Sequence, residues 1–342
     1  MNGQRPIVGI SSGDPAGIGP EVTVKALNDR RIYDLCRPLV VSDAGVVADA
    51  VRFSGLDLSV RAVSSPEEGK YKYGVVDVLD LHNMPREELR YKTATPAQGK
   101  ASFEYIARNI ALAMEGRVHA TVTGPINKAA VNSAGFHYAG HTEIYADLTK
   151  TRDYTMMLAD GAFRVAHVST HVSLRRACDL VKKERVLKVI ELSCNALKKM
   201  GIASPRIAVA GLNPHSGEGG LFGDEEITEI IPAIAEAQAA GLNVEGPVPP
   251  DTVFPKMAGG KFDVVVVMYH DQGHIPIKLK GFTFDEKTGQ MGAVAGVNIT
   301  LGLPIIRVSV DHGTAFEIAG EGRANPHSMI DSVELAAWLA KE

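Results

Sequence analysis

The 342-residue sequence is poor in cysteine, in excess charge of either sign and in long apolar runs. Its three cysteines, Cys36, Cys178 and Cys194, are far apart and form no C-x-x-C pair. Such sparse cysteines argue against a disulfide framework and are typical of a reducing cytoplasm. No apolar stretch approaches the ~20 residues that a membrane-spanning helix needs, and the first residues lack the apolar core of a signal peptide. We therefore expect a cytoplasmic protein without a membrane partner.

The charge balance excludes another class of partner. The formal net charge is −4 and no basic block or stripe is present, which argues against a nucleic-acid partner. Hydrophobic residues make up 45% of the chain and charged residues 22%, the balance of a globular protein with a sizeable core. The length predicts one large α/β domain or two lobes that share a cleft.

Short β-branched runs alternate along the chain with longer segments of helical period. Several of these runs are apolar nearly throughout, as expected of strands covered by helices on both faces. The alternation predicts an α/β fold with a largely parallel sheet, whereas the three prolines of Asn243–Asp251 predict a loop. The expected strands are Ile7–Ile10, Leu39–Ser42, Val75–Leu79, Ala120–Thr123, Phe163–His167, Arg206–Ala210, Val264–Met268 and Ile305–Val310, and the expected helices are Gly19–Ala26, Ala97–Glu115, Thr142–Leu148, Lys183–Met200 and Asp224–Gln238.

Three histidines, His171, His215 and His270, follow predicted strands at a short distance. The carboxyl ends of parallel strands line the ligand crevice of an open α/β sheet. Imidazole is the commonest protein ligand of zinc-like cations, and three such ligands leave one coordination position open for water or substrate. The residues predict either a metal site or three hydrogen-bonded loop histidines, and their spacing does not decide between these readings. His167, at the end of a predicted strand, is expected to be structural.

The segment GHTEIYADL is a candidate anion site, because His141 and Thr142 stand at the start of a predicted helix. Thr142 is either an ordinary N-cap or part of an anion seat, since the free N–H groups of a helix N-terminus attract phosphate. Lys278 and Arg307 are cations that could complete a phosphate clamp. Arg307 is the more informative of the two, because it stands in the apolar run IIRVSV, where burial of a guanidinium is costly without an anionic partner.

Two glycine-rich segments are candidates for a nucleotide site. Gly13–Val22 reads GDPAGIGPEV; its glycines permit close approach of the backbone, and Pro20 and Glu21 suit the first turn of a helix. This segment does not match the G-x-G-x-x-G fingerprint of a Rossmann site. Asp311–Pro326 reads DHGTAFEIAGEGRANP and is either a tight loop around a flat ligand or a plain surface loop.

A series of short segments occurs in the order of one enzyme family: GDPAGIGPE, TGPINK, GHTE, STH, LNPHSGEGG, DTVF, YHDQG, GVNITLGLP and SVDHGTA. Together they are similar to the 4-hydroxythreonine-4-phosphate dehydrogenase family over essentially the whole chain. The stretch from His312 to Pro326 also resembles the adenine-binding loop of isocitrate and isopropylmalate dehydrogenases. The resemblance implies an α/β/α fold of that type in two lobes. Residues 1–125 and 297–342 would form the cofactor-side lobe, and residues 126–296 the metal, substrate and dimerisation lobe.

The resemblance also implies a site. It implies a homodimer with the site at the junction of lobes and subunits and with metal ligands shared across the interface. One divalent metal is expected per site, and imidazole-only ligation favours zinc or cobalt over manganese or magnesium. The implied metal ligands are His171, His215 and His270; the substrate-binding residues are His141, Thr142, Lys278, Asn298 and Arg307; the catalytic residues are Asp251 and Lys278; and the cofactor-binding residues are Gly13, Asp14, His312, Gly313, Thr314, Ala315, Glu317 and Asn325.

The expected cofactor is NAD. In the related decarboxylating dehydrogenases an acidic residue binds the ribose hydroxyls of the adenosine, and the matching position here is Glu317. A carboxylate there accepts hydrogen bonds from a 2′-hydroxyl and repels a 2′-phosphate, which favours NAD over NADP.

The segment after YHDQG departs from the vitamin B6 enzymes of the family. It is longer, over Leu279–Ala295, and His274 stands where those enzymes have leucine. Both features resemble a side branch that oxidises 4-phospho-D-threonate or 4-phospho-D-erythronate. We therefore expect NAD-dependent oxidation with decarboxylation to dihydroxyacetone phosphate and CO2. The alternatives are a 4-phosphohydroxy-L-threonine dehydrogenase of pyridoxal phosphate synthesis, an aromatic cis-diol dehydrogenase, and a phospho-ligand-binding protein without catalysis.

Overall fold

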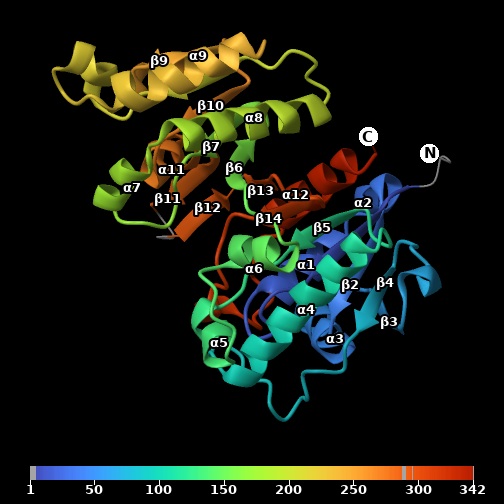
Figure 1. Cartoon of the computed structure of the whole chain (residues 1–342). Coiled ribbons are helices and arrows are strands. Elements are labelled where there is room, and N and C mark those ends of the chain that lie inside the picture. Colours follow the sequence, from blue (N-terminus) through green and yellow to red (C-terminus); the bar gives the residue numbers. More distant parts are fainter. Residues whose placement is uncertain (1–4, 287–289, 295, 342) are drawn as a thin grey trace. The chain divides into compact units, whose positions relative to one another are not determined.

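The computed structural model describes residues 5–286, 290–294 and 296–341 and is drawn in Figure 1. Contacts between Cα atoms divide the chain into two compact units. The first consists of Met1–Thr151, Ala293–Val297 and Leu303–Glu342, and the second of Arg152–Gly292 and Asn298–Gly302. Both units are thus built from segments that are discontinuous in sequence.

The first unit is built on a parallel sheet. Its strands lie in the order β3-β4-β2-β1-β5-β14, and the neighbouring strands pair in parallel. The strands expected in this part of the chain are all present. β3 was not expected, because it is an edge strand whose residues are mostly exposed or half-buried and carry no apolar pattern. The bounds are β1 (Ile7–Ser11), β2 (Arg37–Ser42), β3 (Ser59–Val63), β4 (Val75–Asp80), β5 (Ala120–Thr123) and β14 (Arg307–Val310).

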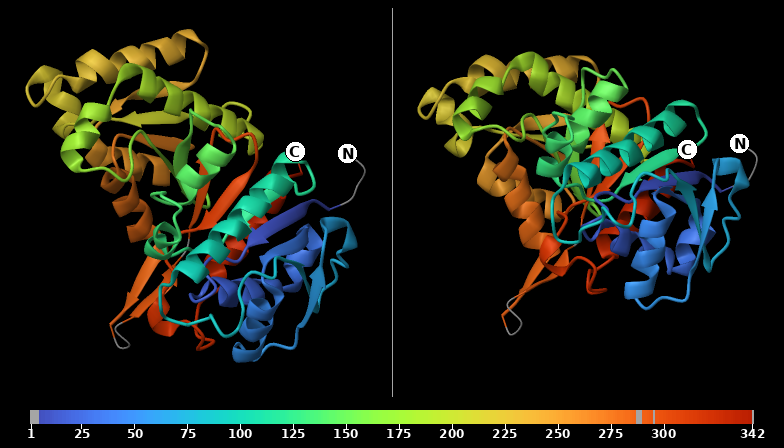
Figure 2. Two further views of the ribbon diagram at one scale, coloured as in Figure 1. Left: turned by 60° about the horizontal axis from the view of Figure 1, so that its bottom comes forward. Right: turned by 90° about the horizontal axis from the view of Figure 1, so that it is seen from below.

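Helices cover both faces of this sheet, as the two views of Figure 2 show. On one face α4 (Pro96–Met114) contacts β1, β2 and β5, and its Tyr105 shares a buried cluster with Leu39 of β2. On the other face α12 (His327–Leu339) contacts β14, β5 and β1. The remaining helical segments are α1 (Gly19–Leu27), α2 (Arg30–Leu35), α3 (Ala44–Phe53), η1 (Pro66–Glu68), α5 (Lys128–Ser133), α6 (His141–Leu148) and η4 (Phe316–Ile318).

The main strands of the second unit lie in the order β13-β6-β7-β10-β8-β9. β6 and β7 form an antiparallel pair, whereas the pairs β7–β10, β10–β8 and β8–β9 are parallel. A separate pair of strands, β11 and β12, lies outside this sheet. The bounds are β6 (Thr155–Asp160), β7 (Phe163–His167), β8 (Ile207–Ala210), β9 (Val244–Val248), β10 (Val264–Val267), β11 (Phe282–Asp285), β12 (Gln290–Val294) and β13 (Val297–Leu301).

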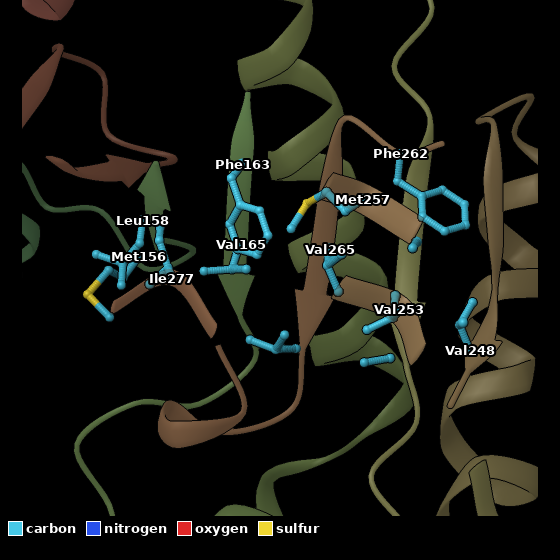
Figure 3. Close-up of a cluster of buried hydrophobic side chains, with 13 residues drawn as sticks. Met156, Leu158, Phe163, Val165, Val248, Val253, Met257, Phe262, Val265 and Ile277 are labelled. Atoms are coloured by element: carbon cyan, nitrogen blue, oxygen red, sulfur yellow. The ribbon is translucent and has the colours of Figure 1, made fainter. Parts of the chain in front are cut away.

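The core of the second unit lies between this sheet and two of its helices. Figure 3 shows Val165 of β7 and Val265 of β10 in one buried cluster with Met257 and Ile277, which belong to α10 (Pro250–Ala258) and α11 (His270–Gly281). α8 (Lys183–Lys199) contacts β6, β7, β8 and β10 without contributing to that cluster, so it covers the opposite face. The other helical segments are α7 (Leu174–Leu180), η2 (Pro214–Gly220), η3 (Glu226–Ile230) and α9 (Ile231–Ala239).

The expected fold class, an α/β/α arrangement with a largely parallel sheet, is confirmed. One local expectation was wrong and another needs a refinement. The segment Asn243–Asp251 is not a loop: it forms β9 and the start of α10, because an edge strand tolerates proline. The helix expected over Asp224–Gln238 starts with the π-helical turn η3 and becomes α-helical only at Ile231, since Pro232 has no N–H for an α-helical hydrogen bond.

Residues 126–151 belong to the first unit, although the sequence analysis assigned them to the second lobe. They form α5 and α6, and both helices contact α4 of the first unit. Within the described residues, none of the helices is long and apolar enough to cross a membrane. All three cysteines are free thiols.

Candidate active site

The carboxyl ends of three adjacent strands in the second unit carry the histidines expected to bind metal. β10 lies between β7 and β8, and it is parallel to both. His171 follows β7, His215 follows β8, and His270 begins α11 directly after β10. Because parallel strands end at the same edge of a sheet, all three histidines belong to one edge of this unit.

The geometry of His171 and His270 fits a shared cation. Their ring centroids are 5.7 Å apart, which is compatible with two imidazoles whose nitrogens lie about 2.0–2.1 Å from one metal ion. His270 Nδ1 is 2.6 Å from Asp271 Oδ1, an arrangement that holds the proton on Nδ1 and leaves Nε2 as a ligand atom. Across the described parts of the chain, no three His, Cys, Asp or Glu side chains form a group that could hold a metal ion. The fit therefore rests on this pair and on the position of His215.

His215 lies in a strained turn. Residues 215–219 of η2 all have positive φ, including His215 at 53°, Ser216 at 56° and Glu218 at 44°. Non-glycine residues in this conformation cost of order 1 kcal/mol or more each, and such strain clusters at binding sites. The sequence analysis placed His215 in a loop but had no means of predicting its backbone conformation.

Glu226 holds this turn in place. Its side chain is 1% exposed and accepts hydrogen bonds from the N–H groups of Leu212 and Asn213, both at 2.7 Å. The second carboxylate oxygen accepts a bond from Asn213 Nδ2 at 2.9 Å. Glu226 was missed, because a glutamate in the first turns of an expected helix is ordinary on sequence grounds.

Two further histidines lie near His270: His274 contacts its ring, and His167 contacts the ring of His274. His274 stacks on His270 with ring centroids 3.5 Å apart, and its Nδ1 is 2.9 Å from His270 O. His167 is fully buried with Nδ1 3.2 Å from Met156 O, which agrees with a structural role. Burial lowers the pKa of His167 to about 3 and that of His274 to about 4. Both rings are therefore neutral at pH 7.

The other candidate residues of the second unit come from three elements. Asp251 is exposed in the first turn of α10, and Lys278 lies on α11, two turns after His270. Asn298 is in β13, and its buried Oδ1 accepts no hydrogen bond from the described residues. An orphaned buried amide oxygen is unusual in a folded protein, and it suits a position where a ligand supplies the donor.

Arg307 is a buried cation of the first unit. It is 3% exposed in β14, its Nη2 donates to Thr123 Oγ1 at 3.1 Å, and its guanidinium carbon lies 5.5 Å from the centroid of the Tyr145 ring. Burial lowers the pKa of Arg307 to about 10, against the opposing influence of Tyr145 and Glu143. The guanidinium is thus charged at pH 7 in surroundings that disfavour the charge, as expected of a group that binds an anion. The sequence analysis predicted its burial but missed Thr123 and Tyr145.

The first turn of α6 lies beside this cation. Gly140 is the N-cap and no side chain caps the helix, so the alternative reading of Thr142 as an N-cap was wrong. Burial, followed by the positive charges of Arg307 and Lys128, keeps the pKa of His141 well below its ordinary value. The His141 ring is therefore neutral, and its buried Nε2 has no hydrogen-bond partner among the described residues. We call His141, Thr142, Lys128 and Arg307 the anion seat; Lys128, in TGPINK, was missed.

The two glycine-rich segments are neighbours in the first unit. Ile18 N–H donates to Thr314 O at 3.0 Å, and a Cβ on Gly17 would lie 3.0 Å from Thr314 atoms. Gly13 has a φ of +81°, and a Cβ there would be 2.2 Å from Pro125 O, so only glycine allows this approach. β2 and β5 flank β1 on opposite sides, and this reversal of strand order is where such sheets bind ligands.

The two side chains of an ion pair within α1 hold the C-terminal loop against this helix by hydrogen bonds. The buried Glu21 carboxylate accepts hydrogen bonds from Lys25 Nζ at 2.8 Å and from Ala324 N–H at 2.6 Å. Lys25 Nζ also donates to Gly322 O and Ala324 O, both at 2.8 Å. Glu21 was expected only as a residue of a first helical turn, and its contact with the loop, 303 residues away, was missed.

The remaining cofactor candidates occupy the same two segments. The buried Asp14 accepts a hydrogen bond from Ala16 N–H at 2.9 Å, and burial raises its pKa to about 6. His312 Nδ1 is 3.0 Å from Gly313 O, and burial lowers the pKa of this imidazole. Ala315 is left-handed with a φ of 40°, Glu317 is exposed in η4, and Asn325 Oδ1 accepts a bond from His327 N–H at 2.9 Å.

Comparison with known proteins decides the family. The family model described as "Pyridoxal phosphate biosynthetic protein PdxA" matches residues 34–336. The chain belongs to the PdxA family. The resemblance seen in the sequence is thereby confirmed.

Relatives of this PdxA-family chain carry several dehydrogenase names. A protein of Symbiobacterium thermophilum, named "Putative D-threonate 4-phosphate dehydrogenase", is 47% identical over 336 residues, which are 98% of this chain and 97% of the relative. A solved 4-hydroxythreonine-4-phosphate dehydrogenase from Klebsiella pneumoniae is 42% identical, with a TM-score of 0.89 and 100% of each chain covered. A solved terephthalate 1,2-cis-dihydrodiol dehydrogenase from Burkholderia xenovorans LB400 is 30% identical, with a TM-score of 0.67 and 97% of each chain covered. Family and names together make the PdxA-family chain an enzyme of the dehydrogenase class.

The long segment after YHDQG contains the end of α11 and the strands β11 and β12. Of the expected insertion Leu279–Ala295, residues 287–289 and Ala295 lie outside the described residues.

Proposed function

We propose that this PdxA-family dehydrogenase oxidises a 4-phosphorylated 3-hydroxy acid with NAD and a divalent metal, and that the oxidised acid loses CO2. The proposed substrate is 4-phospho-D-threonate or 4-phospho-D-erythronate. Oxidation at C3 gives a β-keto acid, and loss of its carboxylate as CO2 leaves dihydroxyacetone phosphate. The observation that carries the proposal is the set of imidazoles at the ends of β7, β8 and β10. The name of the Symbiobacterium relative supports the choice of substrate.

His171, His215 and His270 would hold the metal. The separation of two of their rings and the carboxylate beside His270 Nδ1 support this assignment, and the all-nitrogen set favours zinc or cobalt. When bound, a divalent cation lowers the pKa of a coordinated hydroxyl and stabilises negative charge on oxygen.

The anion seat of the first unit would bind the substrate's phosphate. Arg307 offers a fork of N–H donors suited to phosphate oxygens, and the uncapped first turn at Thr142 offers backbone N–H groups. The neutral His141 adds a ring nitrogen without adding charge. The second unit offers its own candidates for substrate binding, Lys278 on α11 and Asn298, whose buried Oδ1 would accept a hydrogen bond from a hydroxyl.

The proton of the C3 hydroxyl needs an acceptor near the reacting carbons. Asp251 is the first candidate, because its carboxylate is exposed at the start of α10 and a carboxylate within hydrogen-bond reach of a hydroxyl can act as a general base. Lys278 is the second candidate. The two separate by substitution, because turnover should be lost in Asp251→Asn if the carboxylate is the base and in Lys278→Met if the amine is.

NAD would bind at the adjacent glycine-rich segments, where it supplies the hydride acceptor. Gly13 and Asp14 follow β1, and the loop of His312, Gly313, Thr314 and Ala315 lies beside them. The exposed Glu317 carboxylate would accept hydrogen bonds from the ribose hydroxyls. Asn325 directly follows Ala324, whose carbonyl accepts a hydrogen bond from Lys25 Nζ.

We also propose a homodimer that covers the histidine edge. Large apolar side chains are exposed on each histidine-bearing segment: Leu174 is 62% exposed, Leu221 72% and Leu279 82%. Large apolar side chains left exposed are typical of protein interfaces. Replacement of Leu221 by glutamate is expected to shift the protein to a monomer in sedimentation experiments, whereas glutamate at the equally apolar Met114 of the first unit, which is 51% exposed, should not.

The decisive assay is formation of NADH at 340 nm, with metal added, against four substrates: 4-phospho-D-threonate, 4-phospho-D-erythronate, 4-phosphohydroxy-L-threonine and a carboxylated aromatic cis-diol. Turnover of the phosphorylated sugar acids supports the proposal. Preference for 4-phosphohydroxy-L-threonine, the substrate suggested by the name of the Klebsiella structure, would favour the alternative role in pyridoxal phosphate synthesis. Binding of a phosphorylated acid without any NADH would mean a binding protein.

A further inference from the structure

Gln272 joins the two loops that carry His270 and His215. Its side chain is 7% exposed. Oε1 accepts a hydrogen bond from Met268 N–H at 2.7 Å, and Nε2 donates to Gly211 O at 2.8 Å. Met268 directly follows β10 and Gly211 directly follows β8, so one amide bridges the ends of two neighbouring strands.

The connection extends to both histidine turns. Gly211 lies tightly against the turn of His215, because a Cβ on Gly211 would be 2.7 Å from Ser216 Oγ. Gly211 N–H also donates to Val248 O at 3.0 Å. A shift of Gly211 is therefore passed to residues 215–216, whereas a shift of Met268 is passed to His270, two residues further along.

The segment that carries the third histidine, His171, is also hydrogen-bonded to Met268. Ser169 Oγ donates to Met268 O at 2.9 Å, and Ser169 precedes His171 by two residues. Met268 thus receives one bond from the β7 loop through its carbonyl and gives one to Gln272 through its N–H. These bonds link the three histidine segments across the edge of the sheet.

We propose that Gln272 is a positioning residue that sets the separation of His215 and His270 and thereby the affinity of this edge for a divalent cation. The proposal rests on the proposed function, since it takes these histidines as ligands. Residues that orient metal ligands without touching the metal typically change metal affinity about 10- to 100-fold when they are replaced.

A purely local role would explain only half of this geometry. Gln272 lies in the first turn of α11, and a glutamine there commonly accepts a bond from an N–H that precedes the helix. The bond from Nε2 to Gly211 O crosses to another strand, 61 residues away, and contributes nothing to capping. Gln272→Glu separates the two roles, because glutamate keeps the acceptor for Met268 N–H but loses the donor to Gly211 O.

Gln98 supplies a matched control. It is 0% exposed in the first turn of α4, and its Nε2 donates to Arg90 O at 3.1 Å and to Thr93 O at 2.9 Å. Gln98→Glu makes the same chemical change at the same kind of helix start, but in the first unit. Gln272→Met removes both hydrogen bonds without adding a charge, which controls for the charge of glutamate.

The experiment uses the full-length, metal-stripped protein and Co²⁺ as the probe. Calorimetric titration gives the dissociation constant, and hydrogen exchange reports residues 211–220. We expect Gln272→Glu and Gln272→Met to raise the dissociation constant about 10- to 100-fold and to speed exchange over residues 211–220. Gln98→Glu should leave the dissociation constant and the exchange over residues 211–220 as in the parent, because Gln98 Nε2 bonds to Arg90 O and Thr93 O, both in the first unit.

Unchanged Co²⁺ affinity and unchanged exchange over residues 211–220 in both Gln272 variants would overturn the proposal. Weakened affinity in Gln272→Glu alone would also overturn it, because charge and not position would be responsible. If the parent protein binds no Co²⁺, the metal part of the proposed function fails, and the exchange over residues 211–220 still decides whether Gln272 positions this turn.

Discussion

Replacement of Arg307 by methionine tests whether the anion seat exists, because it separates stability from anion affinity. Methionine is a flexible, unbranched apolar side chain that fills irregular space, so it can occupy the room beside Tyr145 without the charge. Burial lowers the pKa of Arg307 to about 10. At pH 7 the guanidinium is charged in both the folded and the unfolded chain, so this penalty is fully present there. It amounts to about 3 kcal/mol against the folded state.

One contact of Arg307 acts in the opposite direction. A hydrogen bond from a charged donor, as from Arg307 Nη2 to Thr123 Oγ1, stabilises by about 1.5 kcal/mol, whereas the influence of Tyr145 is already contained in the lowered pKa. The penalty is thus offset in part. We therefore expect Arg307→Met to leave the free energy of unfolding of the ligand-free protein unchanged or to raise it by up to about 2 kcal/mol, whereas truncation of an ordinary buried side chain lowers it.

The effect on the substrate is expected to be large. Loss of a charge-assisted hydrogen bond to phosphate costs about 1.5–3 kcal/mol, which corresponds to an increase in KM of about 10- to 100-fold. The assay is steady-state NADH formation with 4-phospho-D-threonate, accompanied by urea unfolding without substrate.

Arg164→Met is the matched control. Arg164 lies in β7, burial also lowers its pKa, and its Nη1 donates to Asp263 O at 3.3 Å. This variant should keep the KM of the parent. A KM for Arg307→Met within twofold of the parent, with kcat unchanged, would refute the anion seat.

Three further perturbations test other parts of the molecule. His215→Ala should lose bound metal and turnover together, as measured by elemental analysis of the dialysed protein and by NADH formation; normal metal content would refute the three-histidine site. Burial raises the pKa of Asp14 from 3.8 to about 6, so the ionised form destabilises the fold increasingly as the pH rises from about 4 to 6. Asp14→Asn should therefore be more stable than the parent by up to about 3 kcal/mol at pH 7.5 but not at pH 4; an equal gain in urea unfolding at both values would contradict this. Glu317→Lys should lower kcat/KM for NAD and raise it for NADP, and an unchanged ratio would remove Glu317 from the cofactor site.

Short-range patterns in the sequence predicted the fold class and many of the strands. Apolar runs such as Val264–Met268 identify buried strands, because a strand covered on both faces needs no polar alternation. The same patterns located the three histidines just after strands, and they predicted burial for Arg307 from its place in IIRVSV. Where the local pattern was weak, as in the edge strand β3 or the proline-containing β9, the prediction failed.

The sequence by itself thus determined the α/β/α class, the family and the residue types available for a metal, an anion and a nucleotide. Only the tertiary structure decided which side chains hold those residues in place. Gln272 reaches Gly211 across 61 positions, Glu21 reaches Ala324 across 303, and Arg307 meets Thr123 across 184. Each contact depends on which strands become neighbours in the sheet. Strand order is set by packing of the whole chain and leaves no periodic trace in the sequence around either partner.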